Sequence, residues 1–90
     1  MVTAEVKVVN RLGLHARPSA MLVTTASRFE SEVWISKDTL RVNGKSIMGV
    51  MMLAAEKGAV LKLEVDGPDE DTALQELIKV IDSGFGEDID

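Results

Sequence analysis

The chain has 90 residues, 46% of them hydrophobic, and we expect a single folded domain over residues 1–90. Its net charge of −5 disfavours nucleic acid and anionic membranes as partners, because both attract basic surfaces. The absence of cysteine excludes disulfides, and no apolar run approaches the roughly 20 residues of a membrane-spanning helix. Since the N-terminus alternates polar and apolar residues and lacks the apolar core of a signal peptide, we expect a cytoplasmic protein that does not insert into membranes.

Alternation of apolar and polar residues predicts four short strands, each with one buried face. They lie at residues 3–9, 32–36, 40–43 and 60–65. Apolar residues spaced by three or four predict a helix from about residue 16, another over residues 46–55, and a third that starts near Pro68 and stops at Gly84. The order β-α-β-β-α-β-α indicates a two-layer α/β (α+β) domain, with helices on one face of a mostly antiparallel sheet.

Acidic residues stand at both ends of the third predicted helix. We interpret Asp69, Glu70 and Asp71 as charges that complement the dipole at the helix start. Residues 86–90 form an acidic tail, which we expect to be frayed.

The predicted middle helix is apolar on all sides. Ile47, Val50, Leu53 and Ala54 form one stripe, and the methionines at positions 48, 51 and 52 form a second. A helix of this kind is either buried on every side or covered by a partner for part of the time. The methionines therefore either fill gaps in the core or form a docking surface, and the small size of the domain slightly favours the surface.

His15 is the only histidine, and it directly precedes the first predicted helix. Free backbone N–H groups in the first helical turn and the helix dipole favour an anion at this point, where Pro18 is also tolerated. Arg17 adds a guanidinium suited to phosphate, and Gly13 allows a tight approach loop. These features suit a histidine that carries a phosphoryl group, but an N-cap histidine is often structural, and the residues alone leave both interpretations open.

Two motifs resemble a known family. "GLHARPSA" and "NGKSIMGVMMLAAEKG" are similar to the histidine-containing phosphocarrier protein, HPr, of the bacterial phosphoenolpyruvate-dependent phosphotransferase system, over residues 2–85. The resemblance implies an open-faced β-sandwich with strand order 1-4-2-3 and three helices on one side. Ser19 departs from the family, which usually has alanine there, and we expect little consequence.

The resemblance also implies a function and its residues. His15 would accept phosphate on Nδ1 from enzyme I and pass it to enzyme IIA domains, with Arg17 supporting the phosphate and Ala16 and Pro18 forming the helix start. Ser46 would be modified by an ATP-dependent kinase/phosphorylase. The docking face would include Ala20, Ile47, Met48 and Met51. No cofactor or metal is implied, and the protein would be a monomeric carrier and not itself a turnover enzyme.

Two alternatives remain at this level. The ending "DSGFGED" resembles the nitrogen-related branch of the family, whereas the segment after Asn43 resembles sugar-branch and kinase-regulated members. A purely regulatory module, acting through Ser46 and the methionine-rich face, is the second alternative. His15 favours a carrier, because a regulator has no need of a nucleophile. Trp34, predicted on the polar face of its strand, is interpreted as an exposed aromatic residue packed on its neighbours.

Overall fold

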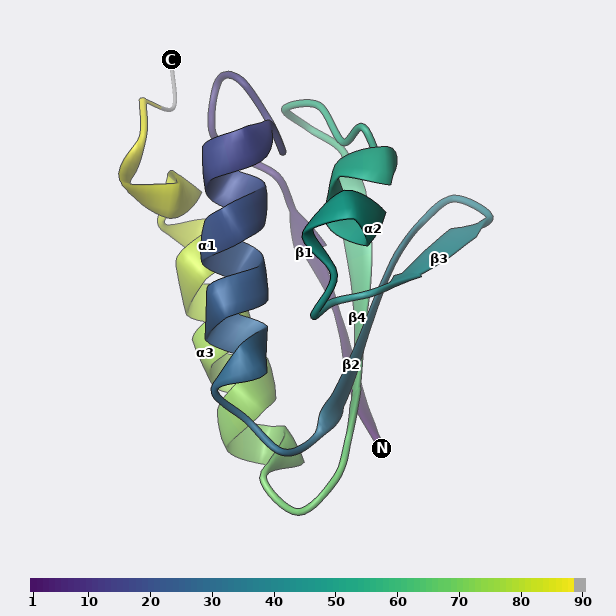
Figure 1. Ribbon diagram of the computed structural model, residues 1–90. Helices are drawn as coiled ribbons and strands as arrows, with labels where there is room; N and C mark the ends of the chain where they lie inside the picture. Colours follow the sequence, from purple (N-terminus) through teal and green to yellow (C-terminus); the bar gives the residue numbers. More distant parts are fainter. Residues whose placement is uncertain (89–90) are drawn as a thin grey trace.

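The computed structural model describes residues 1–88 and contains the predicted strands and helices in the predicted order (Figure 1). A short 3-10 helix follows the last α-helix. The elements are β1 (Val2–Lys7), α1 (Ala16–Ser27), β2 (Glu32–Lys37), β3 (Leu40–Asn43), α2 (Ile47–Met52), β4 (Val60–Asp66), α3 (Glu70–Asp82) and η1 (Gly84–Gly86).

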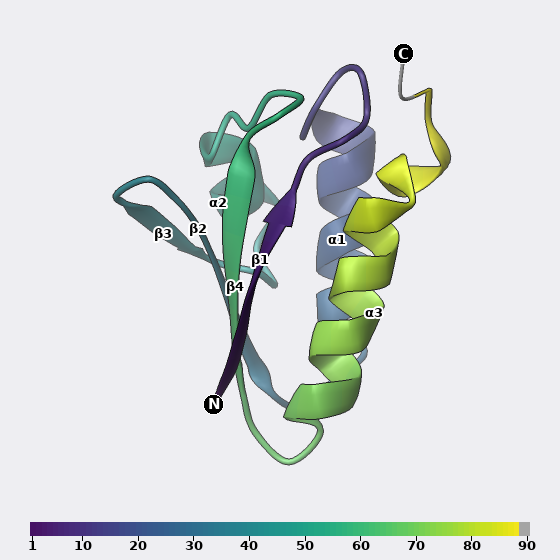
Figure 2. The same cartoon turned by 180° about the vertical axis from the view of Figure 1, so that it is seen from behind.

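The four strands form one sheet in the order β1-β4-β2-β3, and every neighbouring pair is antiparallel. All three α-helices cover the same face of this sheet, and Figure 2 shows the opposite face uncovered. The predicted open-faced two-layer fold is therefore confirmed. No helix within residues 1–88 is long and apolar enough to cross a membrane.

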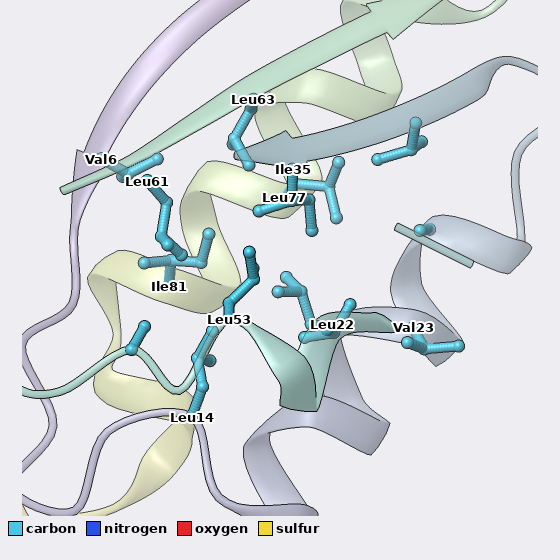
Figure 3. Packing of buried hydrophobic residues seen from close by; sticks show 14 of the residues in the cluster. Val6, Leu14, Leu22, Val23, Ile35, Leu53, Leu61, Leu63, Leu77 and Ile81 are labelled. Atoms are coloured by element: carbon cyan, nitrogen blue, oxygen red, sulfur yellow. The ribbon is translucent and has the colours of Figure 1, made fainter. Parts of the chain in front are cut away.

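The core lies between the sheet and the helices (Figure 3). Alternate residues of the strands, such as Ile35, Leu61 and Leu63, point to the helical layer and are fully buried. Leu22 of α1 and Leu77 of α3 meet them from the other side. This alternation places the remaining strand residues on the uncovered face. There the Cζ atom of the Arg41 guanidinium lies over the Trp34 ring, 4.3 Å from the ring centre.

Helix α2 is shorter than predicted, and only part of its apolar surface is buried. It ends at Met52, because Ala54 adopts a left-handed backbone conformation with φ of 47°. Val50 and Leu53 are buried, whereas Ile47 and Ala54 are exposed, so the apolar stripe that contains these four residues is buried only in part. The ammonium of Lys37 in β2 donates to the carbonyl oxygens of Leu53 and Ala54.

Asp69, Glu70 and Asp71 lie at the start of α3, as predicted, and Asp69 has a second role that was not predicted. Its carboxylate accepts hydrogen bonds from the backbone N–H groups of Glu30 and Ser31 and from the Ser31 hydroxyl. It therefore joins the α1–β2 loop to the start of α3 and makes no side-chain cap of its own helix.

The segment after α3 is ordered, so the prediction of a frayed tail is wrong for residues 86–88. Phe85 is fully buried, and its φ of 57° turns the chain back towards the start of α1. The Asp88 carbonyl accepts a 2.8 Å hydrogen bond from the N–H of Arg11. Positions 89 and 90 of the predicted tail lie outside the described residues.

Candidate functional site

His15 is the N-cap residue of α1, as predicted. The loop that precedes it is held in place by contacts with the segment that follows α2. Gly13 has φ of 68°, and a Cβ at this position would overlap the carbonyl oxygen of Ala55. The N–H of Leu14 donates to the same carbonyl at 2.9 Å. Because this hydrogen bond joins the loop to the segment that follows α2, it fixes the position of His15 relative to α2.

Ser19 braces the loop from inside α1. Its side chain is fully buried, and its hydroxyl donates a 3.2 Å hydrogen bond to the carbonyl of Leu14. The serine therefore satisfies its hydrogen-bonding capacity at a position where a small side chain is required.

The imidazole of His15 lies against the carboxylate of Glu87. Its Nε2 atom is 3.0 Å from Oε1 and 2.9 Å from Oε2. Within residues 1–88 the other ring nitrogen, Nδ1, makes no hydrogen bond, and the side chain is 38% exposed. The hydrogen bond from His15, aided by Asn10 and by the charge of Arg17, lowers the pKa of the Glu87 carboxyl from its ordinary value, although partial burial opposes this shift.

Arg17 reaches the same carboxylate from the first turn of α1. Its Nη1 atom is 3.0 Å from Glu87 Oε2 and donates to the carbonyl of Phe85 at 3.2 Å. The structure therefore brings together His15 and Arg17, both of which the sequence predicted. They meet through a residue that the sequence analysis did not select.

Glu87 and Asn10 are the site residues that sequence reasoning missed. Asn10 is fully buried, and its amide nitrogen donates to Glu87 Oε1 at 3.0 Å and to the carbonyl of Gly13 at 2.8 Å. The available signal was the Gly84-Phe85-Gly86 run, since an aromatic residue between two glycines in a polar tail indicates a buried turn.

The methionine-rich side of α2 is exposed next to this cluster. Met48 is 78% and Met52 is 67% exposed, and Ile47 and Met51 are also at the surface, so the interpretation of the methionines as core filling is wrong. An open groove lies between the loop that carries the imidazole and the segment that follows α2. Its lining includes Leu12, His15, Ala54 and Glu56.

Ser46 is the N-cap residue of α2. Its hydroxyl accepts a 3.1 Å hydrogen bond from the N–H of Gly49. The serine is partly exposed at the edge of the methionine-rich side.

Comparison with known proteins identifies the family. Residues 2–83 match the family described as "PTS HPr component phosphorylation site". The chain is 54% identical to the phosphocarrier protein HPr of Neisseria meningitidis serogroup A over 87 residues, which cover 97% of this chain and 98% of that protein. The chain belongs to the HPr family of phosphocarrier proteins.

Two further relatives match over nearly their whole length. The crystal structure of HPr from Thermoanaerobacter tengcongensis superimposes with a TM-score of 0.94 at 46% identity, covering 98% of this chain and 99% of that one. The HPr-like protein Crh of Halalkalibacterium halodurans is 46% identical over 82 residues, 91% of this chain and 98% of Crh. The observed fold is therefore that of HPr.

The site places an imidazole beside groups that favour an anion. A carboxylate engages Nε2, a guanidinium stands beside it, and the start of α1 supplies backbone N–H groups without intrahelical partners. No group of three or more potential metal-ligating side chains gathers in the described part of the chain.

Proposed function

We propose that this HPr-family protein, acting as a single monomeric domain in the cytoplasm, carries a phosphoryl group on Nδ1 of His15. The group is received from enzyme I and passed to enzyme IIA domains of the sugar phosphotransferase system. The observation that carries the proposal is the His15 ring at the start of α1, with Nε2 engaged by Glu87 and Arg17 bound to the same carboxylate.

The transfer step follows from this geometry. The lone pair of Nδ1 forms the bond to phosphorus, while the bond from phosphorus to the donor breaks and its electron pair leaves with the donor. Arg17 supports the charge on the transferred group, and the Ala16 N–H at the helix start adds a positive dipole end, whereas Pro18 has no N–H to contribute. Transfer to the next protein reverses these events, so the chain is a carrier and not a turnover enzyme.

The surface around His15 fits large partners better than a small substrate. Ala20 on α1 and Ile47, Met48 and Met51 on α2 lie at or near the surface of the helical layer that carries the ring. Flexible methionines adapt to different partner surfaces, which suits a carrier that meets enzyme I and several enzyme IIA domains. We assign these four residues to the docking face.

Ser46 is assigned as a regulatory site for a serine kinase/phosphorylase. Its partial exposure admits a kinase, and its place at the N-terminus of α2 tolerates added negative charge. Regulation alone, without phosphoryl transfer, is the second candidate function, and the similarity to Crh of Bacillus subtilis, which is described as a catabolite repression HPr, favours it. Assignment to the nitrogen-related branch remains the alternative within the carrier function.

The deciding experiment is incubation with phosphoenolpyruvate and enzyme I. We expect label on the wild-type protein through a bond that is labile in acid and to hydroxylamine, and its transfer to an enzyme IIA domain. His15→Ala is expected to fold normally, because the ring is partly exposed, and to accept no label. A labelled Ala variant would contradict the assignment of His15, and an unlabelled wild type would favour the purely regulatory function.

A further inference from the structure

The two nitrogens of the His15 ring have different surroundings, and this asymmetry has chemical consequences. Nε2 faces both oxygens of the Glu87 carboxylate at 2.9 and 3.0 Å. Nδ1 makes no hydrogen bond within the described residues. We propose that Glu87 is a positioning residue that directs the phosphoryl group to Nδ1, an inference that rests on the carrier function proposed above.

Several contacts hold the Glu87 carboxylate in place, so the structure of the site itself fixes its position against the His15 ring. Asn10, itself fully buried, donates to Oε1, and Arg17 contacts Oε2. On either side of Glu87 the chain is anchored by the buried ring of Phe85 and by the hydrogen bond between Arg11 N–H and the Asp88 carbonyl. The Glu87 side chain is only 16% exposed.

This arrangement selects one form of the neutral imidazole. A carboxylate only accepts hydrogen bonds, so the ring nitrogen that faces it must carry the proton. Neutral imidazole has one N–H, and with the proton on Nε2 the lone pair available for reaction is on Nδ1. Glu87 therefore fixes the tautomer and the orientation of His15.

Glu87 also disfavours attack by Nε2, both sterically and by its negative charge. The carboxylate occupies the approach to Nε2 within hydrogen-bonding distance, and its negative charge repels an incoming phosphoryl donor there. When Nδ1 forms the bond to phosphorus, the donor bond breaks and the ring becomes positively charged. The proton on Nε2 stays against Glu87, which stabilises this charge until the proton is lost to solvent.

The first test examines the free protein by nitrogen-15 NMR of its single histidine. In the wild type, above the pH at which the ring is protonated, we expect the proton on Nε2. Glu87→Gln retains an oxygen that accepts from Nε2 and is expected to keep this tautomer, whereas Glu87→Ala is expected to give a mixture. Glu5→Gln, which removes one charge from the exposed side of β1, is the matched control and should resemble the wild type.

The second test uses phosphoramidate, a small donor that needs no docking surface. The attacking ring nitrogen bonds to phosphorus, the phosphorus–nitrogen bond of phosphoramidate breaks, and its nitrogen takes a proton and leaves as ammonia. We expect product at Nδ1 in the wild type, Glu87→Gln and Glu5→Gln. In Glu87→Ala the ratio of Nε2 to Nδ1 product should rise about tenfold, equivalent to about 1.4 kcal/mol, the scale of one charge-assisted hydrogen bond.

The outcomes separate this inference from the proposed function. The same tautomer and the same product ratio in the wild type and in a folded Glu87→Ala variant would overturn the role of Glu87. So would wild-type product at Nε2. Failure of the wild type to accept phosphate from enzyme I would instead overturn the carrier function, since neither test above involves that enzyme.

Discussion

In the proposed function, the side chain at position 17 contacts acceptors within the protein and must also be able to bind a phosphate. Arg17 uses a single nitrogen, Nη1, for both the Glu87 carboxylate and the Phe85 carbonyl. Within residues 1–88 its Nε and Nη2 atoms make no hydrogen bond. The planar guanidinium therefore keeps two donor nitrogens for the transferred group without leaving the carboxylate.

Arg17→Lys tests whether one side chain binds both the Glu87 carboxylate and the phosphate. Lysine keeps the charge, but its three donors sit on one nitrogen and it lacks the planar fork that can bind a phosphate at two points. We expect slower transfer from enzyme I, with the free energy of unfolding changed by less than about 0.5 kcal/mol, as is usual at exposed positions. Transfer rates and urea unfolding of both proteins check this, and equal rates for the two side chains would contradict it.

The difference between predicted and missed site residues has a simple origin. His15 and Arg17 lie in one short motif next to a helix start, so local rules predicted their meeting. Glu87 lies 72 positions from His15 and reaches it only because Phe85 adopts a left-handed conformation and is buried. No local pattern encodes such a contact, and an acidic tail usually indicates fraying.

At the scale of elements, a side chain of β2 contacts the chain where it leaves α2. Apolar residues continue to Ala55, so hydrophobic spacing predicted a helix up to that point. The chain instead leaves the helix at Ala54, and Lys37 from β2 accompanies this turn by donating to two carbonyl oxygens at 3.2 and 3.4 Å. The strands, by contrast, were predicted closely, because alternation directly reflects one buried face.

Lys37→Met tests this contact. The methionine retains an apolar stem but no donor, so two carbonyl groups at the end of α2 lose a partner. We expect the free energy of unfolding to fall by about 1 kcal/mol. Thermal or urea unfolding provides the measurement, with Lys7→Met on the exposed side of β1 as the control. Equal stability of the two variants would show that Lys37 does not stabilise this end of the helix.

In the proposed function, Ser46 affects both the stability of α2 and the binding of partners to the exposed side of α2. A phosphate on this N-cap residue adds about −1.5 to −2 charges at the positive end of the helix dipole, which the helix tolerates. The same charge stands at the edge of the surface that contains Met48 and Met51. A partner with acidic groups then meets a repulsion of about 1 kcal/mol in water, and near 4 kcal/mol at an effective dielectric constant of 20, per pair of charges at 4 Å.

Ser46→Asp is therefore expected to weaken binding of enzyme I about tenfold while the melting temperature holds or rises. Ser46→Ala loses the hydrogen bond to the Gly49 N–H and is expected to cost about 1 kcal/mol of stability without slowing transfer. Affinity for enzyme I and melting curves of both variants decide the matter. An Asp variant that binds as tightly as the wild type, or that binds poorly only because it is unfolded, would defeat this mechanism.

For the whole molecule, two carboxylates join parts of the chain that are distant in sequence. Asp69 connects the start of α3 to the α1–β2 loop, and Glu87 connects the C-terminal segment to the start of α1. Hydrogen bonds to Ser31 and to the Glu30 backbone, opposed by partial burial, lower the pKa of Asp69 from its ordinary value. These two links lie at opposite ends of α1, which is therefore fixed at both ends.

Low pH should weaken the hydrogen bonds that the Asp69 and Glu87 carboxylates accept. The lowered pKa values mean that the folded chain binds protons on Asp69 and Glu87 less readily than the unfolded chain does. Their stabilising effect is fully present above the unfolded values of about 3.9 and 4.3, and it is lost as the pH falls through the lower values of the folded state. We therefore expect the melting temperature to decline steeply below about pH 4.

Asp69→Asn isolates one of these contributions. The variant should melt at a lower temperature than the wild type at pH 7, and the gap should narrow on acidification, because the wild-type carboxylate then becomes neutral too. Part of the acid decline should remain, since Glu87 still titrates. Asp71→Asn, which removes the same charge from an exposed site in the first turn of α3, is the control. Melting curves between pH 2 and 7 measure the effect, and a gap between Asp69→Asn and the wild type that stays constant over this range would show that ionisation of Asp69 does not stabilise the fold.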